Sequence, residues 1–229
     1  MEVELSEDKI TLYTRAMETD RKWIVVRIDG KLAGISRDYG RLADISARIA
    51  NEYGHSEKTT AAKKTARKKS APRKETLPYG EVTATAVSFD EVLALKKTVR
   101  WEDMMLFSTD FQKQVWKRLW DMASGPAEIR LLSYSDFAQL CQNKAGVRAV
   151  AHAVGLNPIP VVIPCHLVVP KESIDKIREI QKKAETTIFK GDDLCLETIL
   201  QDTSIDFGEY ALGKELKRQL ISSDIAGAT

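Results

Sequence analysis

The stretch from Val161 to Val169 constrains this chain most, because it is apolar except where Pro164, Cys165 and His166 interrupt it. Its aliphatic β-formers predict a buried strand, and Pro164 predicts that the strand ends or turns there, since proline has no backbone N–H. The thiol of Cys165 would then lie at the mouth of the strand. A thiol in such a run is more often packed as a small hydrophobe than used as a nucleophile. The adjacent imidazole adds little by itself, because neighbouring side chains of a strand point to opposite faces.

The composition excludes several classes of protein. The chain has 229 residues, of which 43% are hydrophobic and 30% charged, as in an ordinary globular protein with one large or two small domains. The first eight residues include four acidic side chains and no apolar segment, and no run of about 18 apolar residues occurs in the sequence. We therefore expect an intracellular protein without membrane association. The cysteines lack the spacing of a disulfide framework or a metal site and the histidines are scattered, so we expect a reducing compartment and no metal. The three cysteines are Cys141, Cys165 and Cys195.

Residues 1 to 54 predict a small α/β unit. Their pattern favours a strand at Trp23 to Ile28, a tight turn at Asp29-Gly30 and a partner strand at Leu32 to Ser36. Apolar residues then recur every three or four positions and predict a helix that packs on this hairpin and ends near Gly54. These residues are Leu42, Ile45, Ile49 and Tyr53. Further elements are expected at Glu81 to Val87, a strand, and at Phe89 to Lys97, a short helix.

Residues 55 to 76 differ in kind from their neighbours. Between Lys58 and Lys74 the chain has eight Lys or Arg residues and no acidic residue. Such a segment cannot bury a core, so we expect an exposed or disordered linker. It is either a solvated connection or a tether that adds salt-sensitive attraction to phosphates, and in a host with a nucleus it is also typical of an import signal.

A longer helix is predicted next. Thr109 and Gln112 have the spacing of a capping box, and Gly125-Pro126 marks the end of the helix. Its apolar face, expected to pack inward, consists of Phe111, Val115, Leu119 and Met122. Trp116 and Trp120 form a further aromatic stripe, for which core packing is the expected explanation.

A pair of short helices follows. Ser133 and Asp136 predict the cap of the first helix, and Gln142 to Lys144 predicts the turn after it. The side chains expected to face inward are Phe137, Leu140 and Cys141 in the first helix and Val147, Val150, Ala151 and Val154 in the second, which ends at Gly155. The opposite face of the second helix is small and basic and suits a close approach to nucleic acid. It carries Arg148, Ala149 and His152.

These motifs resemble the O6-alkylguanine-DNA alkyltransferase family, the methylated-DNA--protein-cysteine methyltransferases. The resemblance spans residues 109 to 169 and resumes at 207 to 224; it is carried by Phe111-Gln112-x-x-Val115-Trp116-x-x-Leu119, the helix pair, Asn157-Pro158-Ile159-Pro160 and Pro164-Cys165-His166. It implies an N-terminal α/β domain with a ribonuclease H-like fold and a mainly α C-terminal domain with a helix-turn-helix. The expected domains are residues 1–100, with the basic segment 55–76, and residues 101–229, with an insertion at 170–206.

The resemblance implies DNA repair by irreversible, stoichiometric transfer of an alkyl group from O6-alkylguanine to Cys165. The substrate is double-stranded DNA whose damaged base is flipped out, and the protein acts once, as a monomer, without a cofactor. An ionised thiol can displace the alkyl carbon from oxygen in one in-line step. By resemblance, His166 activates the thiol through a water, Asp224 orients His166 where the family has glutamate, and Tyr134 assists the departing guanine. Asn157 matches the family's hinge asparagine.

The resemblance also implies how DNA and the flipped base are held. Arg148 matches the arginine that fills the gap left by the extruded base, with Ala149 and His152 on the same helix in the minor groove. Tyr134 is expected to crowd the DNA backbone. The residues implied to line the base pocket are Val154, Pro160, Val162, Tyr210, Ala211 and Leu212.

Besides Asp224, the chain departs from the family in three places. The insertion at 170–206 has no assigned function; Ile174, Ile177 and Ile180 predict an amphipathic helix within it, and a second helix is expected at Leu194 to Leu200. Leu167 stands where the family has arginine, and Leu212 stands where it has a small residue, which narrows the pocket. In the last helix, Leu216 to Ser223, the basic side chains expected on the exposed face are Lys217 and Arg218.

Two other functions remain open at this point. One is a binding protein or regulator that recognises alkylated DNA with the same helix-turn-helix and transfers nothing, although the presence of Cys165 favours chemistry. The other is a Cys-His hydrolase, which would need an oxyanion hole and a histidine from elsewhere in the chain. The expected location is the cytoplasm or nucleoid in a bacterial host and the nucleus in a eukaryotic one.

Overall fold

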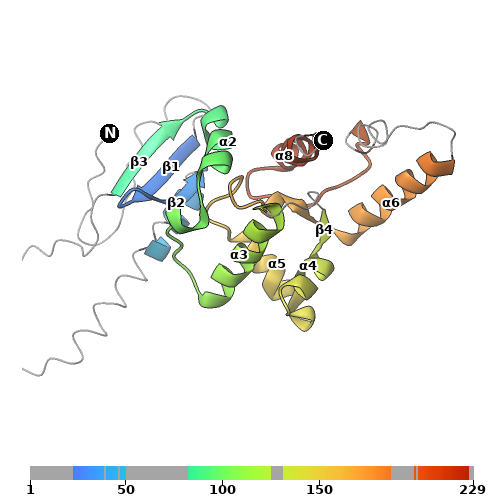
Figure 1. Ribbon diagram of the computed structural model, residues 1–229, viewed down its shortest axis with the longest axis horizontal. Helices are drawn as coiled ribbons and strands as arrows, with labels where there is room; N and C mark the ends of the chain where they lie inside the picture. The colour runs from blue at the N-terminus through green and yellow to red at the C-terminus, as the bar shows by residue number, and fades with distance from the viewer. Residues whose placement is uncertain are drawn as a thin grey trace, which may run out of the picture. The chain divides into compact units, whose positions relative to one another are not determined.

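The computed structural model describes residues 23–38, 40–45, 47–49, 82–124, 131–186, 199 and 201–226 (Figure 1). The chain divides into two compact units, Met1–Thr109 and Asp110–Thr229. Residues 101–109, expected in the second domain, therefore fall in the first unit. The basic segment 55–76, Cys195 and most of the helix expected at 194–200 lie outside the described residues. Among the described helices, none is both long and apolar enough to cross a membrane.

The first unit contains an antiparallel sheet of three strands in the order β2-β1-β3. The strands are β1 (Trp23–Ile28), β2 (Lys31–Ser36) and β3 (Val82–Val87). The predicted hairpin between β1 and β2 is confirmed: Asp29 and Gly30 have φ of 50° and 75°, the left-handed conformation that such two-residue turns require. Ile24, Val26 and Ile28 of β1 are buried in the core of this unit.

Helices cover the core of the first unit. Residues 40–45 and 47–49 are helical, as predicted, and their apolar side chains Leu42, Ile45 and Ile49 belong to that core. The predicted helix after β3 is α2 (Phe89–Thr98), which Ser88 and Glu91 begin with a capping box. A single 3₁₀ turn, η2 (Trp101–Asp103), follows it. The first unit therefore has the mixed α/β content that the sequence predicts.

The second unit is mainly helical. Its elements are α3 (Asp110–Ser124), β4 (Leu132–Ser133), α4 (Tyr134–Leu140), η3 (Lys144–Gly146), α5 (Val147–Gly155), η4 (Cys165–Leu167), β5 (Val168–Val169), α6 (Lys171–Thr186) and α8 (Lys214–Ala226). β4 and β5 form a short parallel pair. α5 packs against both α3 and α4. The side chain of Ser133 caps α4 by accepting a hydrogen bond from the backbone N–H of Asp136, as predicted.

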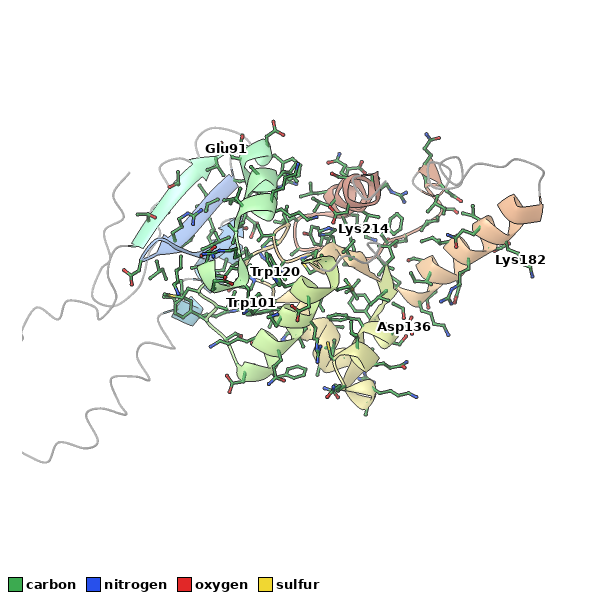
Figure 2. All side chains as sticks on the ribbon, in the orientation of Figure 1. Glu91, Trp101, Trp120, Asp136, Lys182 and Lys214 are labelled. Atoms are coloured by element: carbon green, nitrogen blue, oxygen red, sulfur yellow. The ribbon has the colours of Figure 1, made fainter. Side chains whose placement is uncertain are left out.

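Trp116 joins two helices of this unit. Its side chain is fully buried, and its indole N–H donates a hydrogen bond to the carbonyl oxygen of Ala153 in α5 at 2.8 Å. Trp120, one turn further along α3, is half-buried (Figure 2). Core packing of Trp116 is thus confirmed, and the indole also fixes how α3 lies on α5.

Two details of the predicted core are wrong. Phe111 and Leu140 were expected to face inward, but they are 37% and 43% exposed. Each lies in the terminal turn of its helix, where the neighbouring elements no longer cover the predicted face.

The continuous strand expected at residues 161–169 is also wrong, although every one of these residues is buried. Residues 161 and 162 form a turn, residues 165–167 form η4, and only Val168 and Val169 form a strand. Two prolines explain the difference, because Pro160 and Pro164 fix φ and cannot donate to a sheet. The apolar pattern therefore predicted the burial of residues 161–169 correctly but not their backbone conformation.

We expect Trp116→Phe to lower the free energy of unfolding by about 2 kcal/mol, because it removes a buried hydrogen bond and leaves a void between α3 and α5. Chemical denaturation of the full chain measures this loss. Leu140→Ala, which truncates an exposed side chain of the same unit, is the control and should change stability by less than about 0.5 kcal/mol. Equal losses in the two variants would contradict the buried role of Trp116.

Candidate active site

Asn157 holds the segment that carries Cys165. Its side-chain oxygen accepts a hydrogen bond from the N–H of Ile159 at 3.0 Å, and its Nδ2 donates to the carbonyl oxygen of Ile163 at 2.8 Å. The same Nδ2 lies 3.1 Å from Sγ of Cys165. The amide of this asparagine, which matches the family's hinge position, therefore ties the turn and also places a donor on the sulfur. A donor at this position favours the thiolate over the neutral thiol.

The turn after Asn157 stores backbone strain. Val161 is fully buried and has φ of 75°, a left-handed conformation that a β-branched residue rarely adopts. Such a residue costs on the order of 1–3 kcal/mol and persists only where its surroundings determine it. Here the surroundings are the bridge between Pro160 and Ile163 and the hydrogen bonds of Asn157. The path of the chain into Cys165 is thus set by contacts within residues 157–165.

His166 and Asp224 form a buried pair. Nε2 of His166 and Oδ2 of Asp224 are 2.8 Å apart, and the two side chains are 0% and 8% exposed. The aspartate therefore reaches the imidazole although its side chain is one methylene shorter than the glutamate expected from the resemblance. The ring of Tyr210 meets the imidazole edge-on, with centroids 6.3 Å apart. A carboxylate on one ring nitrogen fixes the tautomer and leaves basicity at the other.

Tyr134 is the first residue of α4 and is half-buried. Burial, and next the negative charge at Cys165, raise the pKa of its phenol above the ordinary value. The hydroxyl consequently stays protonated at neutral pH and can act as a hydrogen-bond donor.

Lys217 corrects the expectation of an exposed basic face on the last helix. It is only 1% exposed, and its Nζ donates to the carbonyl oxygen of Val168 at 2.9 Å. Burial lowers the pKa of its ammonium to about 8, while the negative charge of Cys165 acts in the opposite direction. Because Coulombic coupling is mutual, an ammonium favoured by the thiolate also favours the thiolate.

Sequence reasoning missed Lys217, although a signal was present. Lys217 precedes Asp224 by seven residues, which is about two helical turns, so the two side chains share one face of a helix. If Asp224 reaches His166, Lys217 must face the same region. Arg218 was also expected to be exposed but is half-buried, and its guanidinium donates to the carbonyl oxygens of Asp202 and Ile205.

The remaining predicted residues fall into two groups. Of the four residues expected to meet DNA, Arg148, Ala149 and His152 are exposed on α5, and Tyr134 is half-buried at the start of α4. Of the expected pocket residues, Val154, Pro160, Val162 and Leu212 are buried, Tyr210 is half-buried and Ala211 is exposed. A surface pocket of about 390 Å³ lies elsewhere, where α3 meets the end of α4 near Phe111 and Cys141, and none of the expected pocket residues lines it.

The arrangement supports nucleophilic chemistry at sulfur. Cys165 is 6% exposed, the amide of Asn157 lies 3.1 Å from its sulfur, and the phenol of Tyr134 and the ammonium of Lys217 are electrostatically coupled to it; donors and cations of this kind stabilise a thiolate. In the part of the chain that the structure describes, no group of three or more His, Cys, Asp or Glu side chains is placed to hold a metal ion. The described residues thus form a cluster of polar side chains around the thiol of Cys165.

Comparisons with known proteins point to one family. Residues 110–186 match the model of the 6-O-methylguanine DNA methyltransferase, DNA binding domain. The chain is 45% identical over 71 residues to a probable methylated-DNA--protein-cysteine methyltransferase of Acanthamoeba polyphaga mimivirus, covering 31% of this chain and 45% of that protein. It is 41% identical over 63 residues to the inducible methylated-DNA--protein-cysteine methyltransferase of Bacillus subtilis (strain 168), covering 28% and 33%. The matched part of the chain spans less than half the length of these relatives.

Among solved structures, the chain is similar to the O6-methylguanine-DNA methyltransferase from Pyrococcus kodakaraensis strain KOD1. That likeness covers 90% of this chain and 94% of the other, with 19% identity and a TM-score of 0.41.

We expect Lys217→Met to change stability in a pH-dependent way. Between pH 8 and 10.5 the unfolded chain holds the proton of Lys217 and the folded chain does not, so wild-type stability rises with pH in this window. Below it the buried ammonium costs on the order of 3 kcal/mol, partly offset by its hydrogen bond. The variant should therefore be about 1–2 kcal/mol more stable than wild type near neutral pH and lose this advantage as the pH passes the window.

Urea denaturation of both proteins at neutral pH and above pH 10.5 measures the difference. Lys182→Met on the exposed face of α6 (Figure 2) is the control and should show no such pH dependence. A Lys217→Met advantage that is the same at both pH values would contradict a buried charge at this position.

Proposed function

Because residues 110–186 belong to the DNA-binding domain family of the 6-O-methylguanine DNA methyltransferases, we propose that this chain repairs DNA by direct alkyl transfer. The alkyl group, methyl in the simplest case, passes from O6-alkylguanine to Cys165. The single observation that carries the proposal is the cluster around that sulfur: the amide of Asn157 at 3.1 Å, and beside it the buried pair of His166 and Asp224. This cluster lies in the same unit as the matched domain.

The transfer is a displacement at carbon. The thiolate of Cys165 forms a bond to the alkyl carbon, the bond from that carbon to O6 breaks, and the electron pair leaves with the guanine. His166, oriented by Asp224, takes the thiol proton through a water, and Lys217 favours the resulting thiolate. The protonated hydroxyl of Tyr134 donates to the leaving guanine. Water does not cleave the thioether product, so each molecule acts once, without metal or cofactor.

The target atom cannot be reached inside a duplex, so the base must be flipped out. We assign α4, η3 and α5 to a helix-turn-helix whose second helix meets the minor groove of double-stranded DNA through Arg148, Ala149 and His152. Their exposure supports this assignment. Arg148 fills the place of the flipped base. The base is received by Tyr134, which also crowds the backbone, and by the pocket residues Val154, Pro160, Val162, Tyr210, Ala211 and Leu212.

The remaining parts of the proposal concern the whole protein. The first unit corresponds to a ribonuclease H-like N-terminal domain that supports the second, and the basic segment 55–76 adds attraction to phosphates. The protein acts as a monomer, in the cytoplasm or nucleoid of a bacterial host or the nucleus of a eukaryotic one.

We expect the intact mass of the protein to increase by one methyl group after incubation with duplex DNA that contains O6-methylguanine. Cys165→Ala should gain nothing, and Cys141→Ala, which removes a half-exposed thiol of the same unit, should gain as wild type does. Peptide mass spectrometry should place the methyl group on Cys165. Lesion-selective binding without any gain in mass would refute transfer and leave a recognition protein.

We expect Arg148→Ala to slow transfer from duplex DNA by about 10- to 100-fold, since the flipped state loses a contact that offsets an unstacking cost of a few kcal/mol. Transfer from a single-stranded oligonucleotide should change much less, because there is no paired stack to open. Single-turnover kinetics on both substrates measure this, with the exposed Arg178→Ala on α6 as the control. Equal slowing on both substrates would show that Arg148 contributes charge alone.

A further inference from the structure

The insertion at residues 170–206 forms part of a hydrophobic core. As predicted, Ile174, Ile177 and Ile180 line one face of α6, which begins beside β4 (Figure 1). The buried members of this core cluster are Val169, Ile174, Ile199, Ile205, Phe207 and Ile221. It thus joins the insertion to Ile221 of α8 and to Val169, which ends the strand that follows Cys165–Leu167. The described part of the insertion, residues 170–186, 199 and 201–206, is thus packed against both the segment after the active-site cysteine and the last helix.

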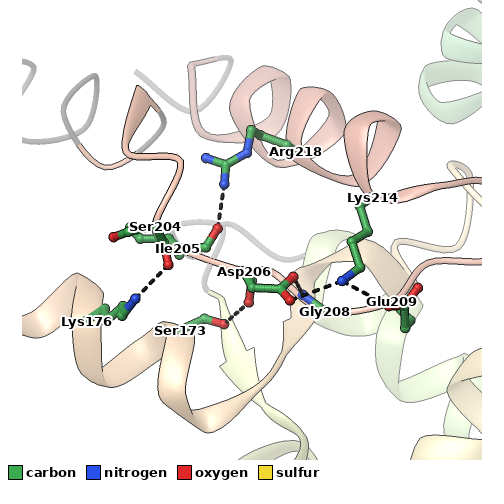
Figure 3. Close-up of polar contacts among 9 residues, drawn as sticks. All are labelled: Ser173, Lys176, Ser204, Ile205, Asp206, Gly208, Glu209, Lys214 and Arg218. Carbon is green, nitrogen blue, oxygen red and sulfur yellow. Dashed lines mark hydrogen bonds and ion pairs between the residues drawn. The ribbon is translucent and has the colours of Figure 1, made fainter.

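Polar contacts hold residues 202–207, which we call the strip, against α6 on one side (Figure 3). The hydroxyl of Ser173 donates to the carbonyl oxygen of Asp206 at 2.6 Å. Nζ of Lys176 donates to the carbonyl oxygen of Ser204 at 2.6 Å. Both donors come from the first two turns of α6, so this end of the helix and the strip form one structure.

The strip is held against α8 on its other side. The guanidinium of Arg218 donates to the carbonyl oxygens of Asp202 and Ile205, and it lies over the ring of Phe207 at 4.7 Å from the centroid. At the start of α8, Nζ of Lys214 lies 3.1 Å from Oδ2 of Asp206 (Figure 3). A planar guanidinium with two carbonyl acceptors and an aromatic face has few alternative positions. Arg218 therefore fixes the rotation of α8 about its axis.

The rotation of α8 determines the geometry of the active site. Lys217 immediately precedes Arg218, and Asp224 lies on the same face as Lys217. The bond from Nζ of Lys217 to the oxygen of Val168 measures 2.9 Å, and the contact of Asp224 with His166 measures 2.8 Å. A small rotation would lengthen both contacts together, because both side chains project from the same helix.

We propose that the insertion positions α8, and that Arg218 is the positioning residue through which it holds Lys217 and Asp224 against the Cys165 site. The effect on repair rests on the proposed function, whereas the effect on the thiol does not. Arg218 touches no reacting atom; it acts through the helix that carries it.

The thiolate of Cys165 reports the position of α8. The charged and titratable groups coupled to this site are Tyr134 from α4, His166 with Asp224 behind it, Lys217 from α8, and Asp206 and Glu209, whose negative charges act on Lys217. Lys217 is the positively charged group of α8 among them, so a movement of its ammonium away from Cys165 makes the thiolate less favourable. The rate of Cys165 alkylation by iodoacetamide against pH follows the thiolate fraction without any DNA.

The test compares wild type with Arg218→Gln, with Arg218→Lys as the conservative variant and Arg178→Gln as the matched control. Arg178 is an exposed arginine of the same insertion that pairs with Asp175. Peptide mass spectrometry gives the alkylation rate at Cys165 across pH. Single-turnover kinetics at saturating DNA give the rate constant and amplitude of methyl transfer.

We expect Arg218→Gln to move the midpoint of alkylation upward by about half to one pH unit and to slow methyl transfer near neutral pH by about 3- to 10-fold. Arg218→Lys should show a smaller shift, and Arg178→Gln should match wild type. The affinity for DNA should not change, because Arg218 is not on α5. A purely structural role would lower the amplitude of transfer and leave the midpoint unchanged, and this result would overturn the proposal.

If Arg218→Gln does not fold, Ser173→Ala provides the test, because it removes only the hydrogen bond to the oxygen of Asp206. Its midpoint should also move upward, and an unchanged midpoint would overturn the proposal. Wild type that takes up no methyl group, combined with a shifted midpoint in Arg218→Gln, would refute the proposed function and support the positioning role. If wild type takes up the methyl group but wild type and Arg218→Gln have the same alkylation curve, the proposed function is supported and the positioning role is refuted.

Discussion

The buried charge on α8 is the constraint on which the rest of the second unit depends. A lysine that is 1% exposed must be compensated, since an isolated ammonium away from water is strongly unfavourable. The oxygen of Val168 and the negative charges of Cys165, Asp206 and Glu209 act in favour of the ammonium. The next acidic group on the same helix face, Asp224, pairs with His166. Stability and reactivity are therefore opposed here, because the ammonium that destabilises the fold is the group that favours the thiolate.

A second cost lies in the segment that leads to the thiol. Val161 adopts a left-handed conformation in a fully buried position, and Asn157 holds both sides of that turn. One amide thus satisfies two backbone groups and reaches the sulfur at 3.1 Å. An apolar replacement at 157 would leave the N–H of Ile159 without its acceptor and the oxygen of Ile163 with only the N–H of Cys165, so the residue serves the fold and the chemistry together.

Sequence patterns predicted the elements well where local rules decide the structure. The Asp29-Gly30 turn and the Ser133 cap follow from backbone preferences that tertiary contacts do not override. The patterns were wrong for two different reasons. Residues 161–163 form no strand because the nearby prolines and Asn157 direct the chain. Lys217 is buried because a carbonyl oxygen from a distant segment, that of Val168, accepts its hydrogen bond. No spacing within one helix identifies such partners, although the distance of Lys217 from Asp224 placed them on one face.

The way the chain enters α8 explains why that helix needs outside support. Gly208 has φ of +82° and lies so close to Pro170 that an added Cβ would be 2.8 Å from its Cγ, and Gly213, just before the helix, has φ of +98°. Glycine at both ends allows the tight path of this segment, but it does little to restrict the direction in which a helix leaves it. The register of α8 must then come from its side chains. Arg218 and Ile221 contact the strip and the insertion core, while Lys217 and Asp224, on the adjoining face of the helix, contact Val168 and His166. Packing along one face of the helix therefore fixes the chemistry along the next.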